Sequence, residues 1–169
     1  AARCRPASLS AHIRFTLPFT PVPFTLQTMT LMVLILTLRD RAWRGVLAYI
    51  ALGLLGDPIF ALGGGPLYLL SPTFGYLLGF LAAAYACGRW KEPLYPYKLV
   101  KIVLLANGLV YLLGYLWLVA YYALLGLGPY SLYLALATGV APFVLWDAAK
   151  MGIAAAVVYE IRRLKSRRS

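Results

Sequence analysis

Long uncharged apolar runs alternate with short basic clusters along this chain of 169 residues. No charged residue occurs between Pro58 and Gly88. A second uncharged run extends from Ile102 to Trp146, and two glycines and a proline within residues 126–129 divide it. A helix needs about 20 mostly apolar residues to cross a bilayer. The pattern therefore predicts membrane-spanning helices over residues 24–38, 46–55, 72–87, 99–125 and 142–159.

The composition supports the same interpretation. The chain is 62% hydrophobic and 12% charged, whereas soluble domains average about 45–50% and about 25%. Because so few polar residues cannot coat a surface that faces water, we expect lipid to be the solvent. The length fits one domain, so we predict a single membrane-embedded substrate-binding domain over residues 1–169. Disordered and disulfide-framework classes are excluded by the same composition.

The basic residues lie in alternate connections between the apolar runs. Residues 56–70 and 126–131 contain no Lys or Arg, whereas three other segments are basic. These basic residues are Arg39, Arg41 and Arg44; Arg89, Lys91, Lys98 and Lys101; and Arg162, Arg163, Lys165, Arg167 and Arg168. By the positive-inside rule, the basic connections and the C-terminus are cytoplasmic. We expect the basic tail to meet anionic lipid headgroups, and we expect no nucleic-acid binding despite the net charge of +11.

The first residues give a weaker helical signal. Residues 1–14 contain Arg3, Arg5, His12 and Arg14, which is poor material for a membrane span. Five spans with a cytoplasmic C-terminus would place the N-terminus outside, so one further helix is expected before residue 17. We therefore predict an all-α integral membrane protein, a bundle of about six helices whose first helix is short or incomplete.

Two connections cannot be regular helix. Pro18, Pro21 and Pro23 lie close together, and each proline lacks an N–H and restricts the residue before it. Gly63, Gly64 and Gly65 form the second irregular segment, on the same side of the membrane by the predicted topology. Irregular backbone at membrane depth occurs only inside protein or beside a cavity. These segments are either ordinary loops or lids over a binding site.

One pair of charged residues falls inside the last predicted span. Asp147 and Lys150 are three residues apart, so they lie on one helical face within pairing distance. Such a pair either locks the helix into the bundle or binds a ligand, and we favour the ligand site because intramembrane charges are usually functional. An ammonium group suits a ligand carboxylate, whereas a carboxylate accepts N–H donors.

Other polar and aromatic residues within the spans are secondary candidates. Gln27 and Asn107 either contact a ligand or hydrogen-bond a neighbouring helix. Tyr111 and Trp117 follow Asn107 on the same predicted helix. Aromatic side chains at such spacings more often serve packing or the interfacial belt than ligand stacking.

Several segments together resemble the BioY family, the biotin-specific substrate-capture (S) components of energy-coupling factor (ECF) transporters. The resemblance is carried first by residues 17–28, which read LPFTPVPFTLQT. It continues in residues 71–80, SPTFGYLLGF, in the glycines of residues 63–65, and in Pro142-Phe143 followed by Asp147 and Lys150. It covers roughly residues 11–165, nearly the whole chain.

The resemblance implies a multi-pass protein of the prokaryotic cell membrane that binds biotin with high affinity from the outer side. Its implied partners are a transmembrane coupling subunit and two cytoplasmic ATPase subunits, which alone would use ATP. No cofactor, metal or catalytic step of its own is expected. In the implied site Lys150 pairs with the biotin carboxylate and Asp147 addresses the ureido group, although the two can exchange ends. Further expected contacts are Gln27 and Asn107 at the ureido group, Phe24, Tyr76, Tyr111 and Trp117 as walls, and Pro21, Pro23, Gly63, Gly64 and Gly65 in the lid loops.

Three other interpretations compete with biotin capture. The same scaffold can serve another vitamin, such as riboflavin or thiamine. An integral membrane enzyme, such as a lipid transferase, would need clustered acids or histidines. The single His and five scattered acidic residues disfavour an enzyme. A scaffold subunit without a ligand would leave the Asp147 and Lys150 pair unexplained.

Overall fold

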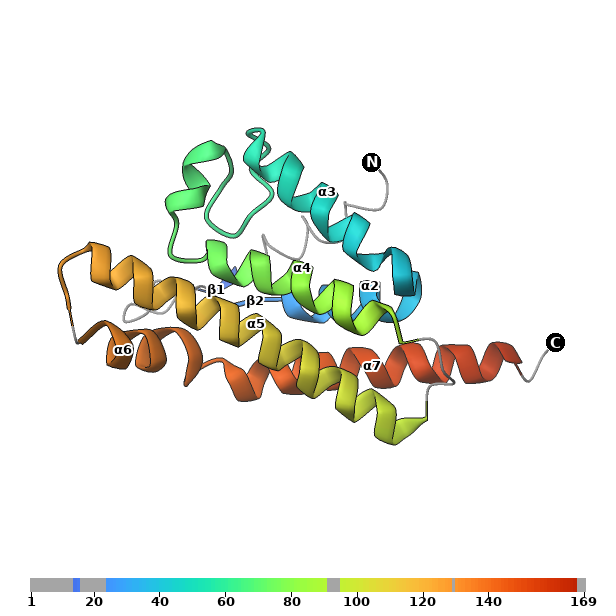
Figure 1. The fold of residues 1–169 in the computed structure, drawn as a ribbon. Helices are drawn as coiled ribbons and strands as arrows, with labels where there is room; N and C mark the ends of the chain where they lie inside the picture. The colour runs from blue at the N-terminus through green and yellow to red at the C-terminus, as the bar shows by residue number, and fades with distance from the viewer. Residues whose placement is uncertain (1–13, 16–23, 91–94, 129, 167–169) are drawn as a thin grey trace.

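The structure is a computed structural model that describes residues 14–15, 24–90, 95–128 and 130–166. Apart from a two-residue antiparallel pair, β1 (Arg14–Phe15) with β2 (Phe24–Thr25), the regular elements of these residues are helical (Figure 1). The α-helices are α2 (Gln27–Leu38), α3 (Ala42–Leu54), α4 (Phe74–Gly88), α5 (Pro96–Leu124), α6 (Tyr130–Ala135) and α7 (Val144–Ser166). The shorter helical segments are η1 (Arg39–Arg41), η2 (Pro66–Leu70) and the π-helical η3 (Leu136–Val140). The predicted all-α class is confirmed; the predicted first helix lies outside the described residues.

Helices α4 and α5 share the most extensive contact among the described helices and lie alongside each other in Figure 1. Glycines on α4 allow this approach. A Cβ atom at Gly79 would lie 2.6 Å from the Cα of Val110, and one at Gly75 would lie 2.1 Å from the Cβ of Trp117. Helices in lipid associate through such close packing because lipid tails are as apolar as the side chains.

The last helix packs against α2 and α5. Its buried side includes Met151, Ala154 and Ala155. On α2 the buried residues include Met32 and Ile35, whose exposed fractions are 0% and 1%. The hydrogen bond between Thr28 and Asp147 shows that the charged start of α7 lies beside the start of α2.

The sequence predicted most helices within a few residues of their observed bounds but missed one. The helix predicted over 142–159 begins at Val144 and continues to Ser166, and α6 with η3 occupies residues that no predicted span covers. A proline at position 142 cannot continue the π-helical segment as regular helix. Among the described residues, Pro96–Leu124 and the Ser131–Ile161 stretch are long and apolar enough to cross a membrane, and α4 is a shorter apolar helix.

The connection between α3 and α4 is irregular, as predicted. Gly63 and Gly65 have positive φ values of 113° and 103°, a conformation that favours glycine. The N–H of Gly65 donates to the carbonyl of Gly53 at 2.7 Å, and a Cβ at Gly64 would lie 2.0 Å from the carbonyl oxygen of Asp57. The glycines therefore fold this connection tightly against the end of α3.

Candidate ligand site

The two charged residues of α7 form an ion pair. The Lys150 Nζ lies 2.5 Å from Oδ1 of Asp147, and the side chains are 18% and 12% exposed. The same Nζ donates to the backbone carbonyl of Thr25 at 2.7 Å. The predicted pairing on one helical face is confirmed, and Lys150 also ties α7 to strand β2.

The Asp147 carboxylate gathers donors from two other helices. Thr28 of α2 donates its hydroxyl to Oδ1 at 3.2 Å, and Tyr111 of α5 donates its hydroxyl to Oδ2 at 2.6 Å. With the ammonium group of Lys150, these hydroxyls surround a largely buried anion. Hydrogen bonds to an ionised group are roughly twice as strong as neutral ones. Asp147 therefore joins α2, α5 and α7 at one point.

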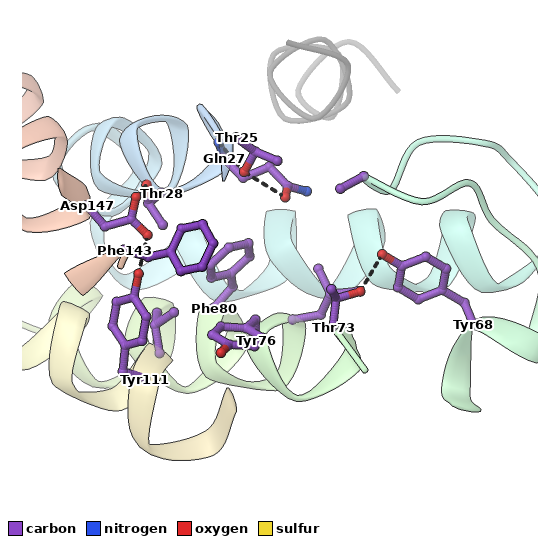
Figure 2. A pocket seen from close by; sticks show the side chains of 13 residues that line it. Thr25, Gln27, Thr28, Tyr68, Thr73, Tyr76, Phe80, Tyr111, Phe143 and Asp147 are labelled. Atoms are coloured by element: carbon purple, nitrogen blue, oxygen red, sulfur yellow. Dashed lines mark hydrogen bonds between the residues drawn. The ribbon is translucent and has the colours of Figure 1, made fainter. Parts of the chain in front are cut away.

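A cavity of about 50 Å³ lies beside this carboxylate. Figure 2 shows the Tyr111 hydroxyl directed at Asp147, with Phe143 and Phe80 close by. The lining residues come from β2, α2, α4, α5, α7, the α3–α4 connection and the segment before α7. They are Thr25, Gln27, Thr28, Ala61, Tyr68, Thr73, Tyr76, Leu77, Phe80, Val110, Tyr111, Phe143 and Asp147.

The lining has the chemistry of a small-molecule site. Apolar and aromatic walls surround a few polar groups, which is the usual anatomy of a ligand pocket. The cavity volume of about 50 Å³ is smaller than the about 300–1,000 Å³ of such pockets. Wall side chains therefore have to move to admit a vitamin-sized ligand.

Some of the predicted contact residues meet at this cavity. Those that line it are Asp147, Gln27, Tyr76 and Tyr111. Tyr76 is held there because its hydroxyl donates to the carbonyl of Gly139 at 2.7 Å and its ring packs edge-on against Tyr111. These residues come from α2, α4, α5 and α7, so the site forms only when four helices assemble.

Other predicted contact residues do not line the cavity. The Nζ of Lys150 is directed to Asp147 and to the Thr25 carbonyl. The amide of Asn107 donates from Nδ2 to the carbonyl of Val144 at 3.1 Å, so it serves as a bond between α5 and α7. Oδ1 of Asn107 is buried without a hydrogen-bond partner, so the bond to Val144 accounts for only one end of the amide.

The wall role predicted for Trp117 is not what the structure shows. Its indole N–H donates to the carbonyl of Ser71 at 2.9 Å, and its ring packs against Phe74 at 5.3 Å between centroids. Trp117 therefore fixes the start of α4 against α5. The backbone of Phe24 lies in β2 opposite Phe15, and its side chain lies outside the described part of the structure.

The lid role predicted for Gly63, Gly64 and Gly65 stays a prediction. Ala61 and Tyr68 line the cavity on either side of residues 63–65, whereas the glycines do not. Tyr68 is fixed by a 2.8 Å hydrogen bond between its hydroxyl and Thr73 Oγ1. Pro21 and Pro23 lie outside the described residues.

Several residues that line the cavity were not predicted from the sequence. The hydroxyls of Thr25, Thr28 and Thr73 belong to this group, as do the rings of Phe80 and Phe143. Thr28 is adjacent to Gln27 in the sequence. Its polar side chain inside an apolar run was the feature that could have indicated a site residue. Threonine is common in membrane helices as a bond to the backbone, so its type alone did not point to a site.

The described residues form a helical bundle around an internal cavity, with two stretches long and apolar enough to cross a membrane. The structure superposes on the crystal structure of the S-component for biotin from an ECF-type ABC transporter with a TM-score of 0.80. That match covers 96% of this chain and 88% of the other, at 22% sequence identity. At that identity the likeness establishes the fold.

The family follows from the sequence comparisons. The BioY family model matches residues 7–167, and the chain belongs to the BioY family. A probable biotin transporter BioY of Lysinibacillus sphaericus is 44% identical over 82 residues, which are 48% of this chain and 41% of that protein. The probable biotin transporter BioY of Pyrococcus horikoshii is 31% identical over 115 residues, covering 66% of this chain and 68% of that protein. The biotin transporter BioY of Thermotoga maritima is 38% identical over 79 residues, or 46% of this chain and 47% of that protein. The chain thus matches less than half the length of the Lysinibacillus and Thermotoga relatives.

Proposed function

We propose that this chain is the biotin-binding S component of an ECF-type vitamin transporter, with no catalytic step of its own. The observation that carries the proposal is the Asp147 carboxylate, held by Lys150, Thr28 and Tyr111 at the wall of an otherwise largely apolar cavity. Family membership and the names of the relatives support biotin as the ligand.

The chemistry of biotin fits these groups. Its ureido ring offers two N–H donors and one carbonyl acceptor, and its fused thioether ring is apolar. Asp147 supplies carboxylate oxygens as acceptors, and Gln27 supplies both an acceptor and donors. The rings of Tyr76, Phe80 and Phe143 supply apolar wall area. We assign the ureido group to Asp147 and Gln27.

The carboxylate end of biotin is assigned to Lys150. Its side chain is 18% exposed, and its ammonium group carries three donors, two of which are directed at Asp147 and Thr25. The bond to the Thr25 carbonyl is the contact that a ligand carboxylate would replace. Phe24 and the prolines of residues 18–23 precede Thr25 directly, so we place a lid there, with residues 63–65 as the second lid.

The experiment is equilibrium binding of tritiated biotin to the detergent-purified chain, with unlabelled biotin, riboflavin and thiamine as competitors. Displacement by biotin alone is the expected result. Displacement by riboflavin or thiamine at similar concentrations would assign the site to another vitamin. Saturable binding of none of the three would contradict an S-component function.

We further propose that the chain works in the prokaryotic cell membrane with a transmembrane coupling subunit and two ATPase subunits. The S-component fold supports such an assembly. Reconstituted vesicles test it. Biotin accumulation should require both the coupling module and ATP on the side of the basic tail, and accumulation by the chain alone would contradict the requirement.

A further inference from the structure

A buried tyrosine connects the cavity to the α3–α4 connection. Tyr49 of α3 is 3% exposed. Its hydroxyl accepts a 2.6 Å hydrogen bond from Nε2 of Gln27 and donates a 2.8 Å hydrogen bond to the carbonyl of Ile59. Gln27 lines the cavity, whereas Tyr49 and Ile59 do not. Tyr49 therefore contacts a cavity residue from behind.

The Ile59 carbonyl decides the orientation of the Gln27 amide. A carbonyl can only accept, so the single proton of the Tyr49 hydroxyl is committed to Ile59. The hydroxyl oxygen can then only accept from Gln27, which must present its NH₂ group to Tyr49. The opposite orientation would set two acceptors against each other. The amide of Gln27 is thereby fixed with Oε1 on the side of Thr25.

The other side of the amide agrees with this orientation. Thr25 donates its hydroxyl to Oε1 of Gln27 at 3.2 Å (Figure 2). An amide oxygen has two lone pairs, so Oε1 can accept one further N–H. Without the hydrogen bonds to Tyr49 and Thr25, the Gln27 amide would not keep this orientation, since either its oxygen or its nitrogen could face the cavity.

The ring of Tyr49 is itself fixed by close packing. It lies edge-on to Phe60, with 5.3 Å between centroids, and Phe60 packs on Tyr68 at 4.5 Å. Phe60 fits because position 53 is glycine: a Cβ there would lie 2.1 Å from Cζ of Phe60. The Tyr49 hydroxyl is therefore held at a defined point between α2 and the α3–α4 connection.

We infer that Tyr49 is a positioning residue for ligand recognition: it orients the Gln27 amide so that Oε1 accepts an N–H of the bound ligand. The inference rests on the proposed function, which supplies a ligand with ureido N–H groups. It adds a residue behind the cavity wall whose effect on affinity passes through Gln27.

A double-mutant cycle separates positioning from a structural role. The variants are Tyr49→Phe, which keeps the ring on Phe60, Gln27→Leu, and the two together. Losing the orientation of one hydrogen bond should weaken biotin binding about fivefold in Tyr49→Phe. In the Gln27→Leu background the same change should alter the dissociation constant by less than about twofold, because no amide remains to be oriented.

The matched control is Tyr115→Phe, which removes a hydroxyl bonded to the carbonyl of Leu132 at 3.5 Å, away from the cavity. It should leave biotin affinity unchanged. Thermal unfolding in detergent is recorded for every variant to check that each is folded. The inference would be overturned if Tyr49→Phe weakened biotin binding equally in the unaltered chain and in Gln27→Leu, or in neither. The proposed function would stand in both cases. Absence of biotin binding by the unaltered chain would overturn the proposed function, and the inference with it.

Discussion

The Tyr111 hydroxyl donates a 2.6 Å hydrogen bond to Oδ2 of Asp147, whereas the Lys150 ammonium group pairs with the other carboxylate oxygen, Oδ1. Tyr111 lies in α5, and Asp147 lies in the first turn of α7. The two carboxylate oxygens are thus held by donors from different directions. This fixes the carboxylate plane at the cavity wall, where an acceptor with a defined orientation can select a ligand N–H.

Removing the Tyr111 hydroxyl should leave the Asp147 carboxylate less firmly oriented at the cavity wall. In Tyr111→Phe we expect biotin affinity to fall about tenfold, since a hydrogen bond to a charged group contributes about 1.5–3 kcal/mol. Equilibrium binding measures the change. The control is Tyr122→Phe, whose hydroxyl bonds Thr138 at 3.0 Å away from the cavity. Equal affinities in both variants would contradict the role of Tyr111.

The ion pair of α7 predicts non-additive stability. Lys150→Met leaves the Asp147 charge without its cation in a site where that side chain is 12% exposed. Breaking a buried pair from one side costs about 3 kcal/mol or more. Adding Asp147→Asn removes the stranded charge, so the double variant should unfold at a higher temperature than Lys150→Met alone. A lower unfolding temperature for the double variant would contradict this.

The glycine contact between α4 and α5 predicts opposite outcomes at two glycines. Gly79→Ala places a methyl group 2.6 Å from the Cα of Val110, so the helices must separate and the unfolding temperature should fall by several degrees. Gly108→Ala is the matched control on α5, because nothing lies within 4 Å of its Cβ position. Alanine there should preserve or raise stability. Similar losses at both positions would contradict the packing argument.

The distribution of basic residues predicts the orientation of the chain. If the tail after α7 is cytoplasmic, a C-terminal green fluorescent protein fusion should fluoresce and a C-terminal alkaline phosphatase fusion should be inactive. A fusion placed in the connection between α5 and α6, which has no Lys or Arg between residues 125 and 131, should give the opposite result. The reverse pattern would invert the proposed topology.

The positions of the helices along the chain were predicted better than the side of each helix that packs against its neighbours. Run lengths and basic clusters located the helices, and the spacing of Asp147 and Lys150 predicted their ion pair. The rotation of α5 about its axis was not predictable, because Tyr111 and Trp117 are both aromatic and only the packing of α4 decides which faces the cavity. Trp117 packs over Gly75 and Phe74 instead.

The missed helix depends on contacts with distant parts of the chain. Most of residues 130–141 lie between the connection predicted over residues 126–131 and the span predicted from residue 142, and no predicted span covers them. The π-helical turn is stabilised by a tertiary contact that no local pattern encodes: Tyr76 donates to the Gly139 carbonyl at 2.7 Å. A Cβ at Gly139 would also lie 2.2 Å from Cδ1 of Leu118, so glycine permits the approach of α5.

The central claim is that Asp147 recognises the ligand. Isothermal titration of biotin into the purified chain, into Asp147→Asn and into Asp40→Asn tests it most directly. Asp40 lies in η1 and is exposed, so it serves as the charge-matched control. We predict unchanged affinity for Asp40→Asn and a loss of at least about tenfold for Asp147→Asn. Affinity in Asp147→Asn equal to that of the unaltered chain would contradict the account.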